Sequence, residues 1–273
     1  GVTTVVDCDF TGIPEEHGLY DALCGHALYL GNTFQGLGGQ AIQIAHRDRP
    51  FQQYKADNLA WAAPPLIVVD DCHAVDCGRF AARSGFTWSF FDPGTPEHPG
   101  TVIVRGCTSV HEWDFARTTG GRRTALDAPD GVRSPGGLVV QHYRGLPKDA
   151  PVGAATNAVV IDRCLFDHAQ SAMPLVAIRG ARTVLIEDSC FIARDGKLPY
   201  VDIDDLPGQP SGRVILQNCV TTEEGPVLLR IGREAVRSMH CPGQRVVIDV
   251  ASRKIEVGDV VEEPLTRVLH PLE

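Results

Sequence analysis

The sequence is poor in aromatic residues and has no long run of apolar residues. Aromatic side chains make up 7% of its 273 residues, and it contains no stretch of about 18 apolar residues, the length that a membrane-spanning helix needs. No membrane span is therefore expected. Motifs of several enzyme classes are also missing, namely GxSxG, the P-loop, HExxH, the EF-hand loop and CxxC. Mechanisms that depend on those motifs are excluded.

Basic residues are too few for a nucleic-acid binder. The 25 Lys and Arg against 34 Asp and Glu give a formal net charge of −9, which would repel a nucleic acid. A polyanionic ligand would need a local basic patch or a bridging cation. The 43% of hydrophobic and 22% of charged residues are typical of a soluble globular protein. We expect one domain over residues 1–273.

The chain begins with Gly1 rather than Met, and its first ten residues, "GVTTVVDCDF", have the composition of a strand. This start predicts a processed chain or a fragment of a longer one, with any signal peptide outside the sequence.

A short apolar segment that ends in a small residue recurs along the chain. Phe follows two residues after that position in four copies, as in "VVIDRCLF" and "VLIEDSCF". In the sixth copy, Cys190 could replace Ser189 if the strand carried a one-residue bulge, but Ser189 keeps Phe191 in register. The recurring position, here named the slot, is occupied by Cys8, Asn32, Cys72, Cys107, Cys164, Ser189, Cys219 and Ala251.

The spacing of the slots predicts stacked strands. Successive slots lie as few as about 24 residues apart, too few for a WD-type blade, and the Leu and Asn pattern of leucine-rich repeats is absent. Helical repeats are also excluded, because the segments lack a period near 3.6. The rung pattern resembles the right-handed parallel β-helix superfamily of pectin-lyase-like proteins over nearly the whole chain. We therefore expect an all-β solenoid of about eight rungs with loop insertions and a C-terminal cap at 254–273.

Two ladders of inward apolar side chains follow from this prediction. One precedes the slot, as in Val102 with Val104. The other follows it and forms a second strand in each rung. The second ladder is predicted at Ile42 and Ile44, Phe80 and Ala82, Val176 and Ile178, Val201 and Ile203, and Leu229 and Ile231.

The repeat explains most of the nine cysteines. Five of them fill slots and are predicted to be core thiols, because Cys packs as a small hydrophobic residue in a tight corner. Within "DCHAVDC", the residues Cys72, His73, Asp76 and Cys77 are an alternative zinc set, but no second Cys pair accompanies them. We therefore assign no metal site. Cys24 and Cys241 fall outside the ladder.

Three insertions supply candidates for substrate binding. They cover residues 47–65, 87–100 and 118–156, and insertions in solenoids collect on the functional face. Exposed aromatic rings beside Arg suit sugar stacking and carboxylate recognition. The alternative is that the rings cover the flank of the solenoid. The insertions supply the substrate-binding candidates Arg47, Tyr54, Trp61 and Trp88; Arg117, next to the third insertion, is a further candidate from the strand ends described below.

Charged residues recur near the end of the second strand of each rung. Stacking would align them along the axis, where Arg could bind an acidic sugar chain and Asp could act as general acid or base or hold a calcium ion. The alternative is a solvated turn in which Arg and Asp neutralise each other. The catalytic candidates are His46, Arg83, Arg179, Asp202, Asp204 and Asp205, with His17 and Tyr20 as further proton-transfer groups.

The resemblance implies action on polysaccharides by lyases, hydrolases or epimerases, although other members are tailspikes or adhesins. The polygalacturonase motifs "NTD", "DD", "GHG" and "RIK" are not found in order, and the "GHA" at 25–27 precedes every Asp pair. Two hypotheses follow: a lyase or glycoside hydrolase acting on a polysaccharide or oligosaccharide, and a non-catalytic module for glycan binding or adhesion. Either would be secreted, periplasmic or on the cell surface.

Overall fold

The computed structural model describes residues 2–13, 16–21, 25–45, 64–78, 86–91, 93–94, 98–111, 136–141, 155–168, 174–193, 200–205, 210–221, 229–231, 234–236, 243–252 and 254–260. In this part of the chain every regular element is a strand, and the strands form three sheets. The predicted all-β class is confirmed.

Sheet A holds β1 (Val2–Val6), β4 (His26–Leu30), β7 (Leu66–Asp70), β10 (Gly100–Arg105), β13 (Thr156–Asp162), β16 (Ala181–Glu187), β19 (Arg213–Gln217), β23 (Gln244–Asp249) and β24 (Lys254–Asp259). Sheet B holds β2 (Asp9–Thr11), β5 (Thr33–Gln35), β8 (His73–Val75), β11 (Thr108–His111), β14 (Leu165–His168), β17 (Cys190–Ala193) and β20 (Val220–Thr221). Sheet C holds β3 (Leu19–Asp21), β6 (Ile42–Ala45), β9 (Phe86–Phe91), β12 (Gly136–Gln141), β15 (Val176–Arg179), β18 (Val201–Asp204), β21 (Leu229–Ile231) and β22 (Glu234–Val236).

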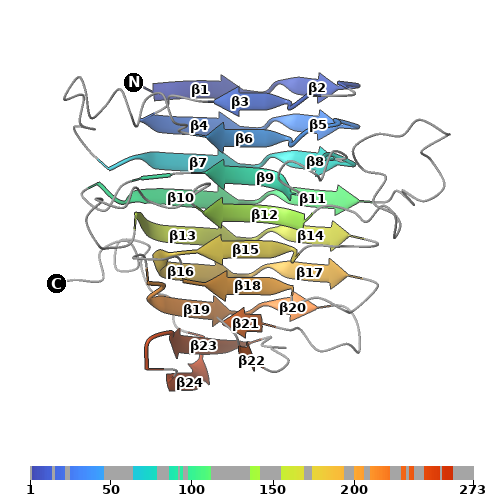
Figure 1. The fold of residues 1–273 in the computed structure, drawn as a ribbon. Helices are drawn as coiled ribbons and strands as arrows, with labels where there is room; N and C mark the ends of the chain where they lie inside the picture. The colour runs from blue at the N-terminus through green and yellow to red at the C-terminus, as the bar shows by residue number, and fades with distance from the viewer. Residues whose placement is uncertain are drawn as a thin grey trace, which may run out of the picture.

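Consecutive strands fall in sheets A, B and C in turn, from β1, β2 and β3 to β19, β20 and β21. We refer to each set of three as a rung. Neighbouring rungs pair in parallel, and Figure 1 shows them stacked from the N-terminal strands in blue to the last rung in orange. This succession is compatible with the predicted β-helix.

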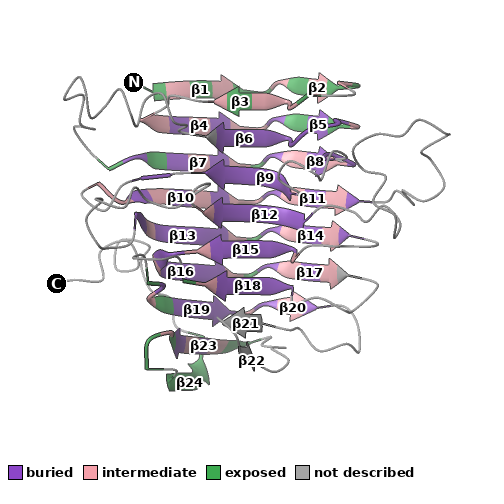
Figure 2. Cartoon of the chain, viewed as in Figure 1, coloured by how far each residue is buried: buried purple, intermediate pink, exposed green. Residues whose placement is uncertain are grey.

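The core lies between the three sheets and is continuous from rung to rung. Val102 pairs with Ile67 on one side and Val159 on the other, and all three side chains are buried. In sheet C the predicted pairs Val176 with Ile178 and Val201 with Ile203 are likewise in register and buried. Figure 2 shows the sheet C strands of the middle rungs largely in purple. Both ladders predicted from the sequence are thus confirmed at these positions.

The second ladder in rung 3 differs from the prediction. Trp88 and Phe90 of β9 pair with Ile42 and Ile44, so they occupy the positions that the sequence assigned to Phe80 and Ala82. Both side chains are fully buried. The prediction was wrong because residues 87–91, taken for an insertion, form the strand itself, and spacing alone does not decide which apolar pair completes a rung.

A two-residue turn joins sheet A to sheet B in each of the seven described rungs. Its first residue has a φ between 47° and 62° in every case. This left-handed conformation costs most residues about 1–2 kcal/mol and is tolerated best by Gly, Asn and Asp. Those types fill all but one of the positions, which are Asp7, Gly31, Asp71, Gly106, Arg163, Asp188 and Asn218.

The second turn residue is the slot, and it satisfies backbone groups in the corner. Asn32 accepts a hydrogen bond from the Cys8 amide at Oδ1 and donates one from Nδ2 to the Val5 carbonyl, both of 3.0 Å. In rung 6, Ser189 Oγ accepts from the Cys164 amide (3.1 Å) and donates to Glu187 O (2.7 Å). Ser189 therefore fills the slot as predicted, and Cys190 begins β17 without a bulge.

The buried slot cysteines Cys72 and Cys107 should resist alkylation in the native protein. A hydrogen bond with Cys107 and burial raise the pKa of the Cys72 thiol, and burial raises the pKa of Cys107. Since the thiolate is the nucleophile, we expect iodoacetamide at pH 8 to leave both unlabelled until urea unfolds the chain. Mass spectrometry of labelled peptides measures this. Rapid labelling of native Cys107 would contradict its placement, and the partly exposed Cys8 is the internal control.

The eighth rung predicted at Ala251 is not formed. β23 runs antiparallel to β19, and β24 runs antiparallel to β23, so Ala251 lies exposed in the turn between them. In sheet C, β22 likewise pairs antiparallel with β21. A reversed strand has the same apolar alternation as a parallel one, which is why the sequence did not reveal the change. The part of the predicted cap beyond 260 lies outside the described residues.

Candidate functional site

The connections that vary in length between rungs are those that lead into sheet C and those that leave it. The A-to-B turn has two residues throughout, whereas the connections into sheet C range from residues 36–41 to residues 112–135. Those leaving sheet C range from residue 180 alone to residues 46–65. Long connections on a regular scaffold are where binding and catalytic groups concentrate. The outer face and strand ends of sheet C are therefore the first place to look for a site.

Arg179 and Asp202 form an ion pair on this outer face. Both alternate with core residues of β15 and β18, so their side chains lie outside the core. Arg179 Nη2 donates to Asp202 Oδ2 (2.5 Å) and Nη1 donates to Asp202 O (3.0 Å). The Asp202 side chain is 0% exposed and that of Arg179 is 19% exposed. The structure therefore brings together these two predicted catalytic residues, with Asp202 holding the guanidinium in place.

Asp204 and Asp205 lie at the accessible end of the same pair of strands. Asp204 pairs with Arg179 in register. Its Oδ1 accepts from the Asp205 amide (2.9 Å), while Asp205 Oδ1 accepts from the Ser211 amide (2.7 Å). Ser211 Oγ also donates to Asp204 O (2.7 Å). Each carboxylate is thus held through one oxygen, so its other oxygen is oriented for a second interaction. We refer to Arg179, Asp202, Asp204 and Asp205 as the sheet C cluster.

Sequence reasoning missed two neighbours of the sheet C cluster. Ser211 is 3% exposed and fixes the turn after β18, as described above. Gln141 ends β12 directly after Val140, which pairs with Ile178, so it lies beside Arg179. The only sequence signal for Gln141 was a polar, uncharged residue at the end of a strand. Ser211 gave no signal, because it lies in the connection after β18 and not at a strand end.

The predicted substrate-binding role of Trp88 is wrong. Its side chain is 0% exposed and packs edge-on against Phe34, with ring centroids 5.7 Å apart. A ring enclosed in the core offers no face to a sugar. A different set of apolar residues lies on the outer face of sheet C: Phe86, Phe91, Val139 and Ala177 form a buried cluster separate from the core.

His17 and Tyr20 lie together but far from the sheet C cluster. Their rings stack at 5.6 Å with an interplanar angle of 22°, and His17 Nδ1 accepts a 3.0 Å hydrogen bond from the Gln40 amide. Tyr20 is on β3, four strands from Arg179 on β15. At roughly 4.8 Å a step this is roughly 19 Å. The two residues therefore do not share a reaction centre with Arg179. The candidates His46, Arg47, Tyr54, Trp61, Arg83 and Arg117 lie outside the described residues.

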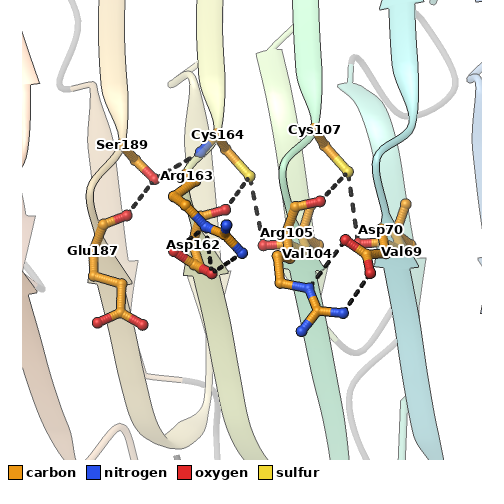
Figure 3. A network of polar contacts seen from close by, with 10 residues as sticks. All are labelled: Val69, Asp70, Val104, Arg105, Cys107, Asp162, Arg163, Cys164, Glu187 and Ser189. Carbon is orange, nitrogen blue, oxygen red and sulfur yellow. Dashed lines mark hydrogen bonds and ion pairs between the residues drawn. The ribbon is translucent and has the colours of Figure 1, made fainter. Parts of the chain in front are cut away.

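A second column of charges, which the sequence analysis did not single out, ends the strands of sheet A. Figure 3 shows Asp70, Arg105, Asp162, Arg163 and Glu187 side by side on neighbouring rungs. Arg105 pairs with Asp70 through two hydrogen bonds and lowers the pKa of that carboxyl. Burial, followed by repulsion from Asp162 and Asp188, raises the pKa of Glu187. The sequence signal was the charged residue directly before the left-handed turn residue.

This column does not resemble a site as closely as the sheet C cluster does. Asp162 is paired with Arg163 at 3.0 Å, and Asp70 with Arg105, so most of its charge is compensated locally. The connections next to it are the invariant two-residue turns. Because the folded-state pKa of Asp70 is lowered, its pair stabilises the fold above the ordinary carboxyl pKa, and that contribution is lost as the pH falls through the lowered value.

Hydroxyl and imidazole groups also meet inside the core. Ser109 Oγ donates to Thr87 Oγ1 (2.9 Å) and lies 2.9 Å from His168 Nε2. His111 Nε2 lies 3.2 Å from Thr87 Oγ1. Such pairs can activate a nucleophile, but the four side chains are at most 2% exposed. A substrate does not reach them, so we assign this network to the corner between sheets B and C.

The residues of "DCHAVDC" do not converge on one point. Cys72 lies in the core, whereas His73 is on the surface, with Nδ1 3.1 Å from Thr108 Oγ1 and Nε2 3.2 Å from Asp71. Within the described ranges, no three His, Cys, Asp or Glu side chains are placed to hold a metal ion. The same part of the chain has no helix long and apolar enough to cross a membrane.

Comparisons with known proteins identify no relative. No protein-family model matches the chain, and neither the curated proteins nor the solved structures contain a match. The site must therefore be interpreted from its own chemistry.

Proposed function

We propose that the protein is a right-handed parallel β-helix that processes a glycan at the sheet C cluster by general acid–base chemistry. The supporting observation is that Asp204 and Asp205 lie beside Arg179 at a strand end between connections of variable length. A carboxylate that is oriented through one oxygen can exchange a proton with substrate through the other. Asp202, enclosed and paired, positions Arg179 and does not itself exchange protons with a substrate.

Cleavage by hydrolysis fits this cluster better than elimination. Hydrolases use two carboxyl groups, and Asp204 with Asp205 supplies two. Elimination from a uronate needs positive charge to neutralise its carboxylate, but the charge of Arg179 is already compensated by Asp202. An acidic glycan would then require a bridging cation such as calcium. Function on an external glycan implies export, so we also propose a secreted, periplasmic or cell-surface location.

A screen for cleavage tests the proposal. The purified protein is incubated with neutral and acidic polysaccharides, with and without calcium, while new reducing ends and the absorbance of unsaturated ends are followed. We expect reducing ends without unsaturation. Asp204→Asn keeps the shape of the side chain and should lower the rate by about 10²- to 10⁴-fold, the usual contribution of a general acid or base.

Asp259→Asn is the matched control, because it removes an exposed carboxylate from β24 at the end of sheet A. Unsaturated products would establish a lyase instead. An Asp204→Asn protein that cleaves as fast as the parent would remove the cluster from consideration.

The second candidate is a non-catalytic module for glycan binding or adhesion. It is favoured by Ser211, whose two hydrogen bonds give the Asp204–Asp205 segment the character of a braced structural turn. A folded protein that binds a polysaccharide of the panel but releases no product would select this candidate.

A further inference from the structure

A carboxylate, an imidazole and a hydroxyl form a chain of polar contacts on the outer face of sheet B. His73 Nε2 lies 3.2 Å from Asp71 Oδ1, and His73 Nδ1 lies 3.1 Å from Thr108 Oγ1. The His73 and Asp71 side chains are 43% and 76% exposed, and Thr108 is partly exposed. A small molecule therefore reaches all three groups, which distinguishes them from the enclosed hydroxyl and imidazole groups of the core.

The backbone holds these three side chains in fixed relative positions. Thr108 of β11 pairs in register with His73 of β8, and the Thr108 amide donates a 3.0 Å hydrogen bond to Cys72 O. Asp71 is the left-handed residue of the turn before β8, and its amide donates to Arg105 O on the next rung (2.9 Å). Reactive groups on strands keep a more precise geometry than groups on loops.

The direction of the two hydrogen bonds makes His73 a base toward Thr108. An ionised carboxylate has no hydrogen to donate, so we assign the hydrogen of the neutral imidazole to Nε2, which faces Asp71. Nδ1 then carries the lone pair, and the Thr108 hydroxyl donates to it. A hydroxyl beside a base that a third group orients is the arrangement of nucleophilic catalysis.

The surroundings of the Thr108 hydroxyl define the class of substrate. Leu165 pairs with Thr108 on the next strand, Val110 lies on the same face of β11, and both are partly exposed, so an apolar group finds contact here. Asp167 pairs with Val110, and its carboxylate disfavours an anionic substrate. The face is open to water, which hydrates the oxyanion formed at an attacked carbonyl. A readily departing leaving group is therefore required, as in a neutral aryl ester.

We propose that Thr108 and His73 are the catalytic residues of a second site, with Asp71 as positioning residue, that hydrolyses neutral aryl esters. Thr108 Oγ1 bonds to the carbonyl carbon while His73 Nδ1 takes the hydroxyl proton. The bond to the aryl oxygen breaks, and the phenol leaves with that proton. Water then attacks the acyl-threonine and gives a proton to Nδ1. Release of the carboxylic acid returns this proton to Thr108.

Hydrolysis of 4-nitrophenyl acetate, followed by the absorbance of the released 4-nitrophenolate, tests this activity. Thr108→Val keeps the shape of the side chain and should lower the protein-dependent rate by about 10²-fold, the lower end of the contribution of a positioned base. Thr108→Ser restores a hydroxyl and should restore the rate. Thr33→Val is the matched control, because Thr33 pairs with His73 from the opposite side but forms its hydrogen bond with Asp9.

Asp71→Asn tests the positioning role. Asn tolerates the left-handed turn, so the fold is kept. Its amide can donate to Nε2, which moves the imidazole hydrogen to Nδ1 and removes the base. We expect the rate to fall by at least about 10-fold. NMR of the ring nitrogens should show hydrogen on Nε2 of His73 in the parent and on Nδ1 in the variant. Hydrogen on Nδ1 in the parent would contradict the assignment.

Mass spectrometry of acid-quenched protein completes the test, with circular dichroism to confirm that each variant is folded. An acetyl group on Thr108, together with slow hydrolysis by both Thr108→Val and His73→Gln, supports the site. If Thr108→Val is as fast as the parent, the site is wrong, and if His73→Gln alone is slow, His73 is itself the nucleophile. Because Asp204 lies on sheet C, Asp204→Asn tests glycan processing separately, and either proposal can fail without the other.

Discussion

Trp88→Ala is expected to lower the free energy of unfolding by about 3–5 kcal/mol, the cost of truncating a large buried aromatic side chain. The ring is fully enclosed between Ile42 and Leu138 of the neighbouring strands and packs against Phe34. Removing it opens a cavity in the middle of the stack, where the parallel strands on both sides limit relaxation. Urea unfolding followed by far-ultraviolet circular dichroism measures the change.

Trp88→Phe is the control for this experiment. It keeps an aromatic ring in the core and removes an indole N–H that has no hydrogen-bond partner among the described residues. We expect a much smaller loss than for alanine, and unchanged glycan binding. A Trp88→Ala protein as stable as the parent would show that the ring is not a core residue and would return Trp88 to the list of surface aromatics.

The turn between sheets A and B shows why so much of the fold is readable from sequence. Few residue types tolerate a left-handed backbone, and few fit a small inward corner, so Asp, Gly or Asn before Cys, Asn or Ser recurs at six of the seven rungs. Asp71 with Cys72 and Gly106 with Cys107 are examples. The preceding apolar alternation then places the strand of sheet A. These constraints act within a few residues, and a single sequence displays them.

Sheet C was less predictable because its strands follow connections of variable length. No local signal states where the strand resumes after a long connection, so Phe80 and Ala82 were chosen over Trp88 and Phe90. The antiparallel direction of β23 was missed for a related reason, because apolar and polar residues alternate in the same way in a parallel and in an antiparallel strand. Register between distant segments is decided by packing across rungs.

The sequence predicted the main residues of the candidate site but not their roles. Charge at the strand end identified Arg179, Asp202 and Asp204, which register then brings together. The sequence could not divide the roles of Asp202 and Asp204, because both face the same side of β18 and the exposure of each depends on what covers it. It also could not separate Tyr20 from the sheet C cluster, since the distance between them depends on the number of strands stacked between β3 and β15.

Replacing either Arg179 or Asp202 alone should lower the free energy of unfolding by about 3 kcal/mol. Arg179→Met leaves the enclosed carboxylate of Asp202 without its guanidinium, and Asp202→Leu leaves a mostly buried guanidinium without its carboxylate. The energetic cost is that of an uncompensated charge away from water. Urea unfolding of both single variants measures it.

The double variant distinguishes this explanation from general disruption of the strands. Arg179→Met with Asp202→Leu removes both charges and keeps apolar volume, so its stability should return to within about 1 kcal/mol of the parent, because buried pairs exchange for apolar groups at little net cost. Additive losses would mean that the two residues act independently. Glu256→Ala, which breaks an exposed pair with Lys254, should cause no measurable change. The double variant should also lose glycan processing while remaining folded, because Asp204 would no longer have a positioned cation beside it.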